Sequence, residues 1–102
     1  MMTYEEAAAV RTYSDAEIGT LWDAFLSIVP DECNLDTKVQ RDLLFALCKT
    51  APYCRETEFP DGTIELVGRF PDTRGCYVEI LVPLEGYGRE ACMHDASAEE
   101  WA

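Results

Sequence analysis

Residues 14–30 have the sequence SDAEIGTLWDAFLSIVP, and this stretch decides the fold. Ser14 and Glu17 have the spacing of a capping box, in which hydroxyl and carboxylate each accept a hydrogen bond from a backbone N–H. Pro30 cannot continue a helix. We expect the stretch to bury one side in a core rather than to expose a binding groove. The large apolar residues recur at spacings of three and four, on one side of an α-helix: Ile18, Leu21, Trp22, Phe25, Ile28 and Val29.

A short helix is expected before this one, within residues 1–13. Thr3 and Glu6 repeat the capping-box spacing ahead of an alanine-rich run. We expect this helix to dock on the domain through Tyr4, Ala8 and Val10.

A second long helix is expected after it, over residues 37–50, with Asn34 or Asp36 as its N-cap. The connection between the two long helices is short, which favours an antiparallel or crossed pair. The apolar side of this helix is predicted to hold Val39, Leu43, Leu44 and Leu47, with Phe45 and Cys48 beside it.

From residue 53 the apolar period changes from helical to alternating. Three antiparallel strands are expected, joined by turns at PDG and PDTRG, over residues 53–59, 63–70 and 76–82. Alternation then predicts which side chains face the helices: Tyr53, Thr57, Phe59, Ile64, Leu66, Phe70, Cys76, Val78, Ile80 and Val82.

The end of the chain leaves two interpretations open. Residues 87–94 form either a fourth strand or irregular structure. Residues 95–102 contain a possible helix start before Trp101, which we expect to fold back on the domain rather than insert into a partner.

Together these elements predict a single α+β domain over residues 1–102. Two main helices and a short N-terminal helix would pack on a three- to four-stranded antiparallel meander. A hydrophobic fraction of 48% argues against disorder. The chain has neither a membrane-spanning run nor a secretion signal, and its five cysteines are irregularly spaced. We therefore expect a cytoplasmic protein with reduced thiols.

Charge is the most unusual property of the composition. Twenty acidic residues against eight basic ones give a net charge of -12, which disfavours nucleic acid and anionic membranes and favours a basic partner. On the predicted sheet, four acids lie on the side away from the helices, with Arg69 the only base. Such clustering weakens a sheet, so this side is either simply solvated or a docking surface. We predict partner binding by these four and by four acids near the C-terminus: Glu56, Glu58, Glu65, Glu79, Glu90, Asp95, Glu99 and Glu100.

No motif predicts catalysis, a metal or a cofactor. Cys92 and His94 are two residues apart, but the chain has no CxxC pair, which structural zinc sites normally use. His94 is the only histidine and has no nucleophile motif near it. Buried structural roles explain most thiols: Cys33, Cys48, Cys54 and Cys76. We expect a protein that is not an enzyme.

Helices followed by a hairpin are similar to the winged helix-turn-helix arrangement. Lys38, Arg41 and Lys49 lie on the helix that would then read DNA, but the acidic hairpin opposes phosphate. The alternative function is therefore a winged-helix-like adaptor or regulatory subunit that binds protein through its helices.

The segment SDAEIGTLWDAF, followed by Ile28, Val29 and Pro30, resembles the opening of small phage and mobile-element proteins. In length, acidity and lack of catalytic motifs the chain is similar to phage-encoded inhibitors of host defence, including anti-CRISPR proteins. The resemblance implies carboxylates that stand in for phosphates in a nucleic-acid groove. We therefore expect a non-catalytic inhibitor that docks on a basic, nucleic-acid-handling protein or nucleoprotein complex.

Overall fold

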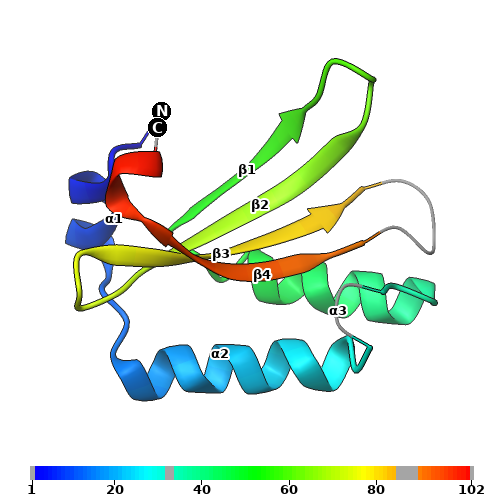
Figure 1. Cartoon of the computed structure of the whole chain (residues 1–102), viewed down its shortest axis with the longest axis horizontal. Coiled ribbons are helices and arrows are strands. Elements are labelled where there is room, and N and C mark those ends of the chain that lie inside the picture. The colour runs from blue at the N-terminus through cyan, green and yellow to red at the C-terminus, as the bar shows by residue number, and fades with distance from the viewer. Residues whose placement is uncertain (1, 32–33, 85–89, 102) are drawn as a thin grey trace.

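The computed structural model describes residues 2–31, 34–84 and 90–101. The four strands form one antiparallel sheet in the order β1-β2-β3-β4, and the α+β class is confirmed. Residues 87–89 of the possible fourth strand lie outside the described residues, and β4 itself begins later. The elements follow one another along the chain (Figure 1): α1 Tyr4–Val10, α2 Asp15–Ile28, α3 Lys38–Cys48, β1 Tyr53–Glu58, β2 Ile64–Pro71, β3 Cys76–Pro83, β4 Cys92–Ser97 and the 3₁₀ turn η1 Ala98–Glu100.

Helix α2 begins with the predicted capping box. The Ser14 hydroxyl accepts a hydrogen bond from the Glu17 N–H, and the Glu17 carboxylate accepts one from the Ser14 N–H, both at 3.2 Å. These bonds satisfy N–H groups that a helix start leaves free. The buried side chains of α2 belong to the predicted apolar side: Ile18, Leu21 and Phe25.

Helix α1 is capped by Thr3, whose hydroxyl accepts from the Glu6 N–H at 3.1 Å. Its buried residue is Ala7, whereas Val10 is 66% exposed. The expected docking through Val10 is therefore wrong, because Tyr4 and Ala7, three residues apart, define the inner side of this short helix, with Ala8 half-buried beside them.

Helix α3 differs from its prediction in both cap and orientation. Thr37, not Asn34 or Asp36, is the N-cap, and it forms a capping box with Gln40. The buried residues are Leu44 and Cys48.

A close approach to the sheet explains this orientation of α3. A Cβ atom at Gly68 of β2 would lie 2.6 Å from the Cys48 carbonyl oxygen and 2.7 Å from its Sγ. The last turn of α3 therefore sits directly on the glycine. Two residues predicted for the buried side, Val39 and Leu43, are turned outward and are 67% and 50% exposed.

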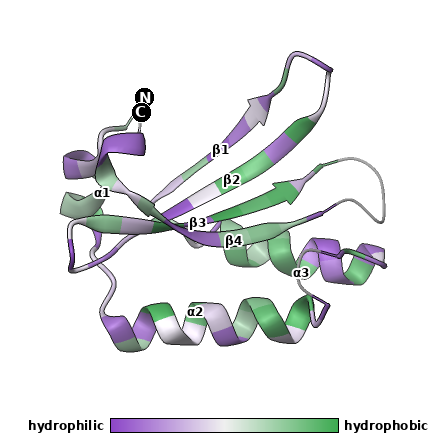
Figure 2. Ribbon diagram, in the orientation of Figure 1, coloured by the Kyte–Doolittle hydropathy of each residue, from purple (hydrophilic) through white to green (hydrophobic). Residues whose placement is uncertain are grey.

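The register of the strands sorts side chains onto two faces of the sheet. Directly paired residues share a face, so the row Gly68, Ile80 and Met93 lies on the helix face, the side toward α2 and α3. The neighbouring row Arg69, Glu79 and His94 lies on the opposite side, the outer face. Strands β2 and β3 place their predicted apolar residues on the helix face, and β3 is mostly hydrophobic along its length (Figure 2).

Strand β1 is one residue out of phase with the prediction. Tyr53 pairs with Arg69 and Thr57 with Glu65, so both lie on the outer face instead of the helix face. Because side chains alternate between faces, this single step also moves every other side chain of the strand to the opposite face.

A second buried cluster covers one end of the outer face. Trp101 is 2% exposed and packs with Tyr53, Tyr77, Ala96 and Ala7. Its indole Nε1–H donates to the Met2 carbonyl at 2.7 Å, so α1 and η1 lie side by side at this end of the sheet (Figure 1). The expectation that Trp101 folds back on the domain is confirmed. No helix among the described residues is long and apolar enough to cross a bilayer.

Candidate functional site

The four predicted sheet acids do not form one surface. Glu56 pairs with Leu66 and Glu58 with Ile64, so both lie on the helix face, where they are exposed. Glu65 and Glu79 remain on the outer face. The predicted acidic face is therefore split between the two sides of the sheet.

Glu79 is a buried partner of Arg69, not a surface acid. It is 8% exposed, and Arg69 Nε donates to its carboxylate at 2.5 Å. Arg69 also donates to the Trp101 carbonyl at 2.6 Å and lies 5.1 to 5.3 Å from the ring centroids of Tyr53, Tyr77 and Trp101. Glu79 thereby fixes the position of Arg69, which binds the C-terminal turn through the Trp101 carbonyl, and the role of Glu79 is structural.

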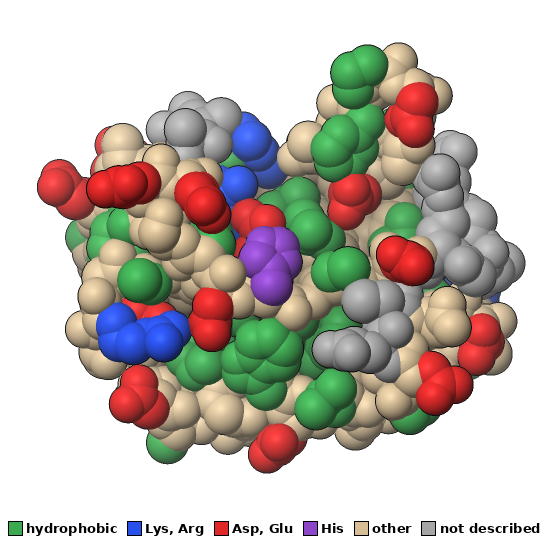
Figure 3. Space-filling model, viewed as in Figure 1, with side chains coloured by type: hydrophobic (Ala, Val, Ile, Leu, Met, Phe, Trp, Pro, Cys, Tyr) green, Lys and Arg blue, Asp and Glu red, His purple; other side chains and the backbone are tan. Residues whose placement is uncertain are grey.

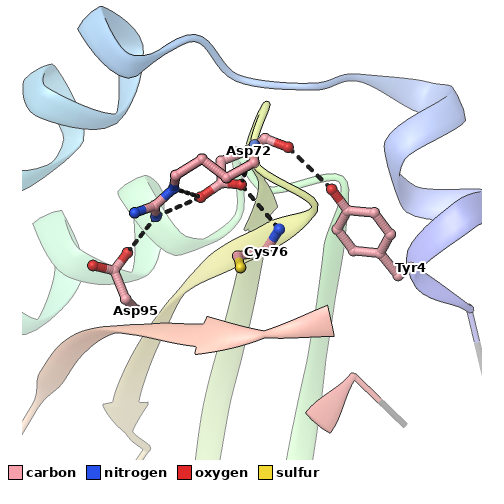
Figure 4. Close-up of polar contacts among 5 residues, drawn as sticks. Tyr4, Asp72, Cys76 and Asp95 are labelled. Carbon is pink, nitrogen blue, oxygen red and sulfur yellow. Dashed lines mark hydrogen bonds and ion pairs between the residues drawn. The ribbon is translucent and has the colours of Figure 1, made fainter. Parts of the chain in front are cut away.

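The tail acid Asp95 belongs to another structural network (Figure 4). Arg74 donates to Asp95 at 3.1 Å and, through two nitrogens, to Asp72 at 2.9 and 2.6 Å. The other oxygen of Asp72 accepts from the backbone N–H groups of Arg74 and Cys76. The Tyr4 hydroxyl donates to the Asp72 carbonyl at 3.0 Å. The network fixes the β2–β3 turn against α1 and β4.

The Asp72 carboxyl titrates below its usual range. Burial alone raises its pKa, but the hydrogen bonds from Arg74 and from the N–H groups of Cys76 and Arg74 outweigh burial and lower the pKa overall. Asp72 is 2% exposed and its carboxylate accepts four hydrogen bonds. It is therefore a structural carboxylate and not a catalytic base.

One of the predicted tail acids does meet another acid. Glu99 of η1 and Glu5 of α1 line the same hollow, where Tyr4 packs edge-on against Trp101 with ring centroids 5.9 Å apart, and Glu100 and Glu6 follow them in the first turns of the same two helices. We call these four glutamates the acidic end. All four are exposed, and none forms an ion pair with a base in the part of the chain that the structure describes.

Two glutamates of the acidic end border a hollow of about 500 Å³, which is lined by Thr3, Tyr4, Glu5, Ala98 and Glu99. In the space-filling view, acidic side chains crowd the corner where α1 and η1 lie (Figure 3). The remaining tail acid, Glu90, forms an isolated antiparallel β-bridge with Asn34 through its backbone and is not part of this group. Sequence analysis missed Glu5 and Glu6 because nothing local links the two ends of the chain.

Two of the thiols, Cys48 and Cys54, have raised pKa values. Loss of solvent around the sulfur is the main cause for both, and contact with the Cys54 thiol raises the pKa of Cys48 further. Cys48 is buried as expected, but Cys54 is exposed because of the β1 phase, and Cys33 lies outside the described residues. Within residues 2–31, 34–84 and 90–101, no three His, Cys, Asp or Glu side chains are placed to hold a metal ion.

No protein-family model matches the chain, and neither a curated protein nor a solved structure is significantly similar to it.

Proposed function

We propose that this protein is a non-catalytic inhibitor of the anti-defence type, whose acidic end docks on a basic, nucleic-acid-handling protein or nucleoprotein complex. Its glutamates would occupy positions that phosphates take in the partner. The observation that supports this is the meeting of Glu5 and Glu99 at one hollow, each followed by a second glutamate, although they come from opposite ends of the chain; none of the four forms an ion pair among the described residues.

Helix capping explains only part of this arrangement. Glu5 and Glu6 lie in the first turn of α1, and Glu99 and Glu100 in the first turn of η1, where negative charge suits the helix dipole. Capping does not require two acidic helix starts to lie side by side, since like charges at close range repel. Their placement together therefore favours a role in binding over a role in stabilising the fold.

The overall charge supports the same kind of partner. A net charge of -12 attracts a basic surface over a distance comparable to the Debye length, about 10 Å at 0.1 M salt. Association should therefore be fast and should weaken as salt rises.

A capture experiment tests the proposal. The tagged protein is incubated with host lysate at about 50 mM and about 500 mM NaCl, salts that bracket a Debye length of about 10 Å, and retained proteins are identified by mass spectrometry. We expect a nucleic-acid-binding complex at low salt that is lost at high salt and is displaced by added nucleic acid.

Two variants with the same change of net charge locate the contact. One carries Glu5→Gln, Glu6→Gln, Glu99→Gln and Glu100→Gln, and should lose the partner. The control carries Asp23→Asn, Asp31→Asn, Glu56→Gln and Glu58→Gln, all at exposed positions elsewhere, and should keep it. Equal loss in both would mean that only net charge matters, and retention by both would remove the acidic end as the site.

A second candidate function, a winged-helix-like adaptor that binds protein through its helices, is favoured by one observation. Val39 and Leu43 on α3 are 67% and 50% exposed although both are large and apolar. Binding through such side chains would change little with salt.

A further inference from the structure

The two long helices form a groove on the side of the molecule away from the acidic end. Gln40 Nε2 donates to the Ile28 carbonyl at 3.1 Å, so the start of α3 lies beside the end of α2. The end of α3 lies beside the start of α2, and the helices are therefore antiparallel (Figure 1). The groove has a volume of about 240 Å³ and is lined mainly by apolar atoms of Tyr13, Glu17, Thr20, Leu21, Ala24 and Leu47.

An apolar stripe continues this groove along α3. Val39, Leu43 and Leu47 are each four residues apart, so they follow one another along one side of the helix. Leu47 lines the groove, whereas Val39 and Leu43 are 67% and 50% exposed. The core uses Leu44 and Cys48 instead. Leu47 is partly buried against the core, whereas Val39 and Leu43 are exposed apolar surface outside it, the kind of patch that marks protein contacts.

The charges around the groove define the partner. On α3, Lys38 is paired with Asp42 at 2.6 Å, and before α2, Arg11 is paired with Glu17. Asp23 lies three residues after Thr20 on α2, is exposed, and has no ion pair among the described residues. An exposed acid without an ion pair among the described residues therefore lies next to the groove.

A second copy of the chain is a poor occupant of the groove. Each copy has a net charge of -12, so two copies repel one another as they approach. A partner with basic residues is attracted instead.

We propose that this groove binds a basic amphipathic helix of a partner protein. Its apolar residues, spaced by three and four, would cover Leu47, Leu43 and Val39, and a Lys or Arg on its flank would face Asp23. Val39 and Leu47 are eight residues apart, about 12 Å along a helix, which matches two turns of a partner helix. The inference deepens the second candidate function, on which it rests, and does not depend on the acidic end.

Fluorescence anisotropy with synthetic peptides tests the inference. The probe is a labelled 18-residue peptide of Leu and Lys, ordered so that a helix has one apolar and one basic side. A peptide with Glu for Lys and a scrambled Leu–Lys peptide are the comparisons. We expect the amphipathic basic peptide to bind and the other two to bind at least about tenfold more weakly, a difference of about 1.4 kcal/mol.

Matched variants locate the binding surface. Val39→Ser and Leu43→Ser remove the stripe, whereas Val10→Ser and Leu26→Ser change residues of similar exposure elsewhere, 66% and 46%. The stripe pair should weaken peptide binding about tenfold, and the control pair less than about twofold. All four positions are exposed, so thermal melts should confirm that both variants fold.

Several outcomes would overturn the inference. If the scrambled or the acidic peptide bound equally well, the partner would not be a basic amphipathic helix. If the control pair lost binding as much as the stripe pair, the groove would not be the binding site. Sedimentation that shows a dimer broken by Val39→Ser and Leu43→Ser would make a second copy the occupant. The Gln variant of the acidic end should lose its partner from the lysate but bind the peptide normally. The lysate experiment therefore tests the acidic end, and the peptide experiment tests the groove.

Discussion

Asp72 holds the β2–β3 turn in place through its carboxylate, which binds Arg74 and two backbone N–H groups, and through its backbone carbonyl, which accepts from Tyr4 of α1. We predict that Asp72→Asn lowers the free energy of unfolding at pH 7 by about 2–3 kcal/mol, because bonds to a charged acceptor are lost in a buried place. Urea denaturation measures the change, and Asp23→Asn, at an exposed position, should change it by less than about 0.5 kcal/mol.

The Asp72→Asn variant also tests how the stability of the fold depends on pH. The folded pKa of Asp72 is lower than the ordinary value of 3.8, so its stabilisation is present above pH 3.8 and is lost as pH falls through the folded pKa. The difference in stability between the native protein and Asp72→Asn should therefore shrink below that pH. A difference that stays constant down to pH 2 would contradict the assigned pKa direction.

Arg69 and Glu79 form a buried pair whose two members depend on each other. Arg69→Met should lower the free energy of unfolding by about 3–5 kcal/mol, because the buried Glu79 carboxylate loses the guanidinium and keeps only His94, 3.4 Å away, beside it. The double variant Arg69→Met, Glu79→Leu should recover a large part of that loss. Chemical denaturation of both single variants and the double variant gives the coupling, and additive losses would show that the pair is not a unit.

At the scale of elements, the contact between α3 and β2 leaves no room for a side chain at Gly68. Gly68→Ala would place a Cβ within 2.7 Å of both the carbonyl oxygen and Sγ of Cys48, so helix or strand must move. We predict a loss of about 1–3 kcal/mol from overpacking, measured by urea denaturation. Gly19→Ala, where a Cβ meets nothing within 4 Å, is the matched control and should be neutral or stabilising.

At the scale of the whole molecule, charge opposes compactness. The net charge is -12, and the excess acidic side chains repel one another more strongly in the folded state than in the expanded chain. We predict that raising NaCl from about 50 to about 500 mM stabilises the fold by an amount on the order of 1 kcal/mol, since salt screens exposed charges. Thermal melts measure this, and a neutral sugar at matched osmolality is the control. A melting temperature that falls with salt would mean that favourable ion pairs outweigh repulsion.

Local signals made much of the fold predictable. The Ser14–Glu17 box and the apolar period after it identify α2, and Thr3 identifies α1, because capping and helical spacing involve residues only three or four apart. The alternating residues of β2 and β3 likewise predicted their helix-facing sides. Proline and glycine placed the turns.

Tertiary contacts decided the rest. Residues 53–59, YCRETEF, alternate almost equally well in either phase, and only the packing of Tyr53 against Trp101 and Arg69 decides which face Glu56 and Glu58 share. The close approach at Gly68 similarly decides which side of α3 is buried and leaves its apolar stripe outside. The sequence by itself therefore determined the helices, most of the strands and the acidic composition. Which acids share a surface depends on contacts between residues distant in the sequence, and such contacts cannot be predicted from local residue spacing.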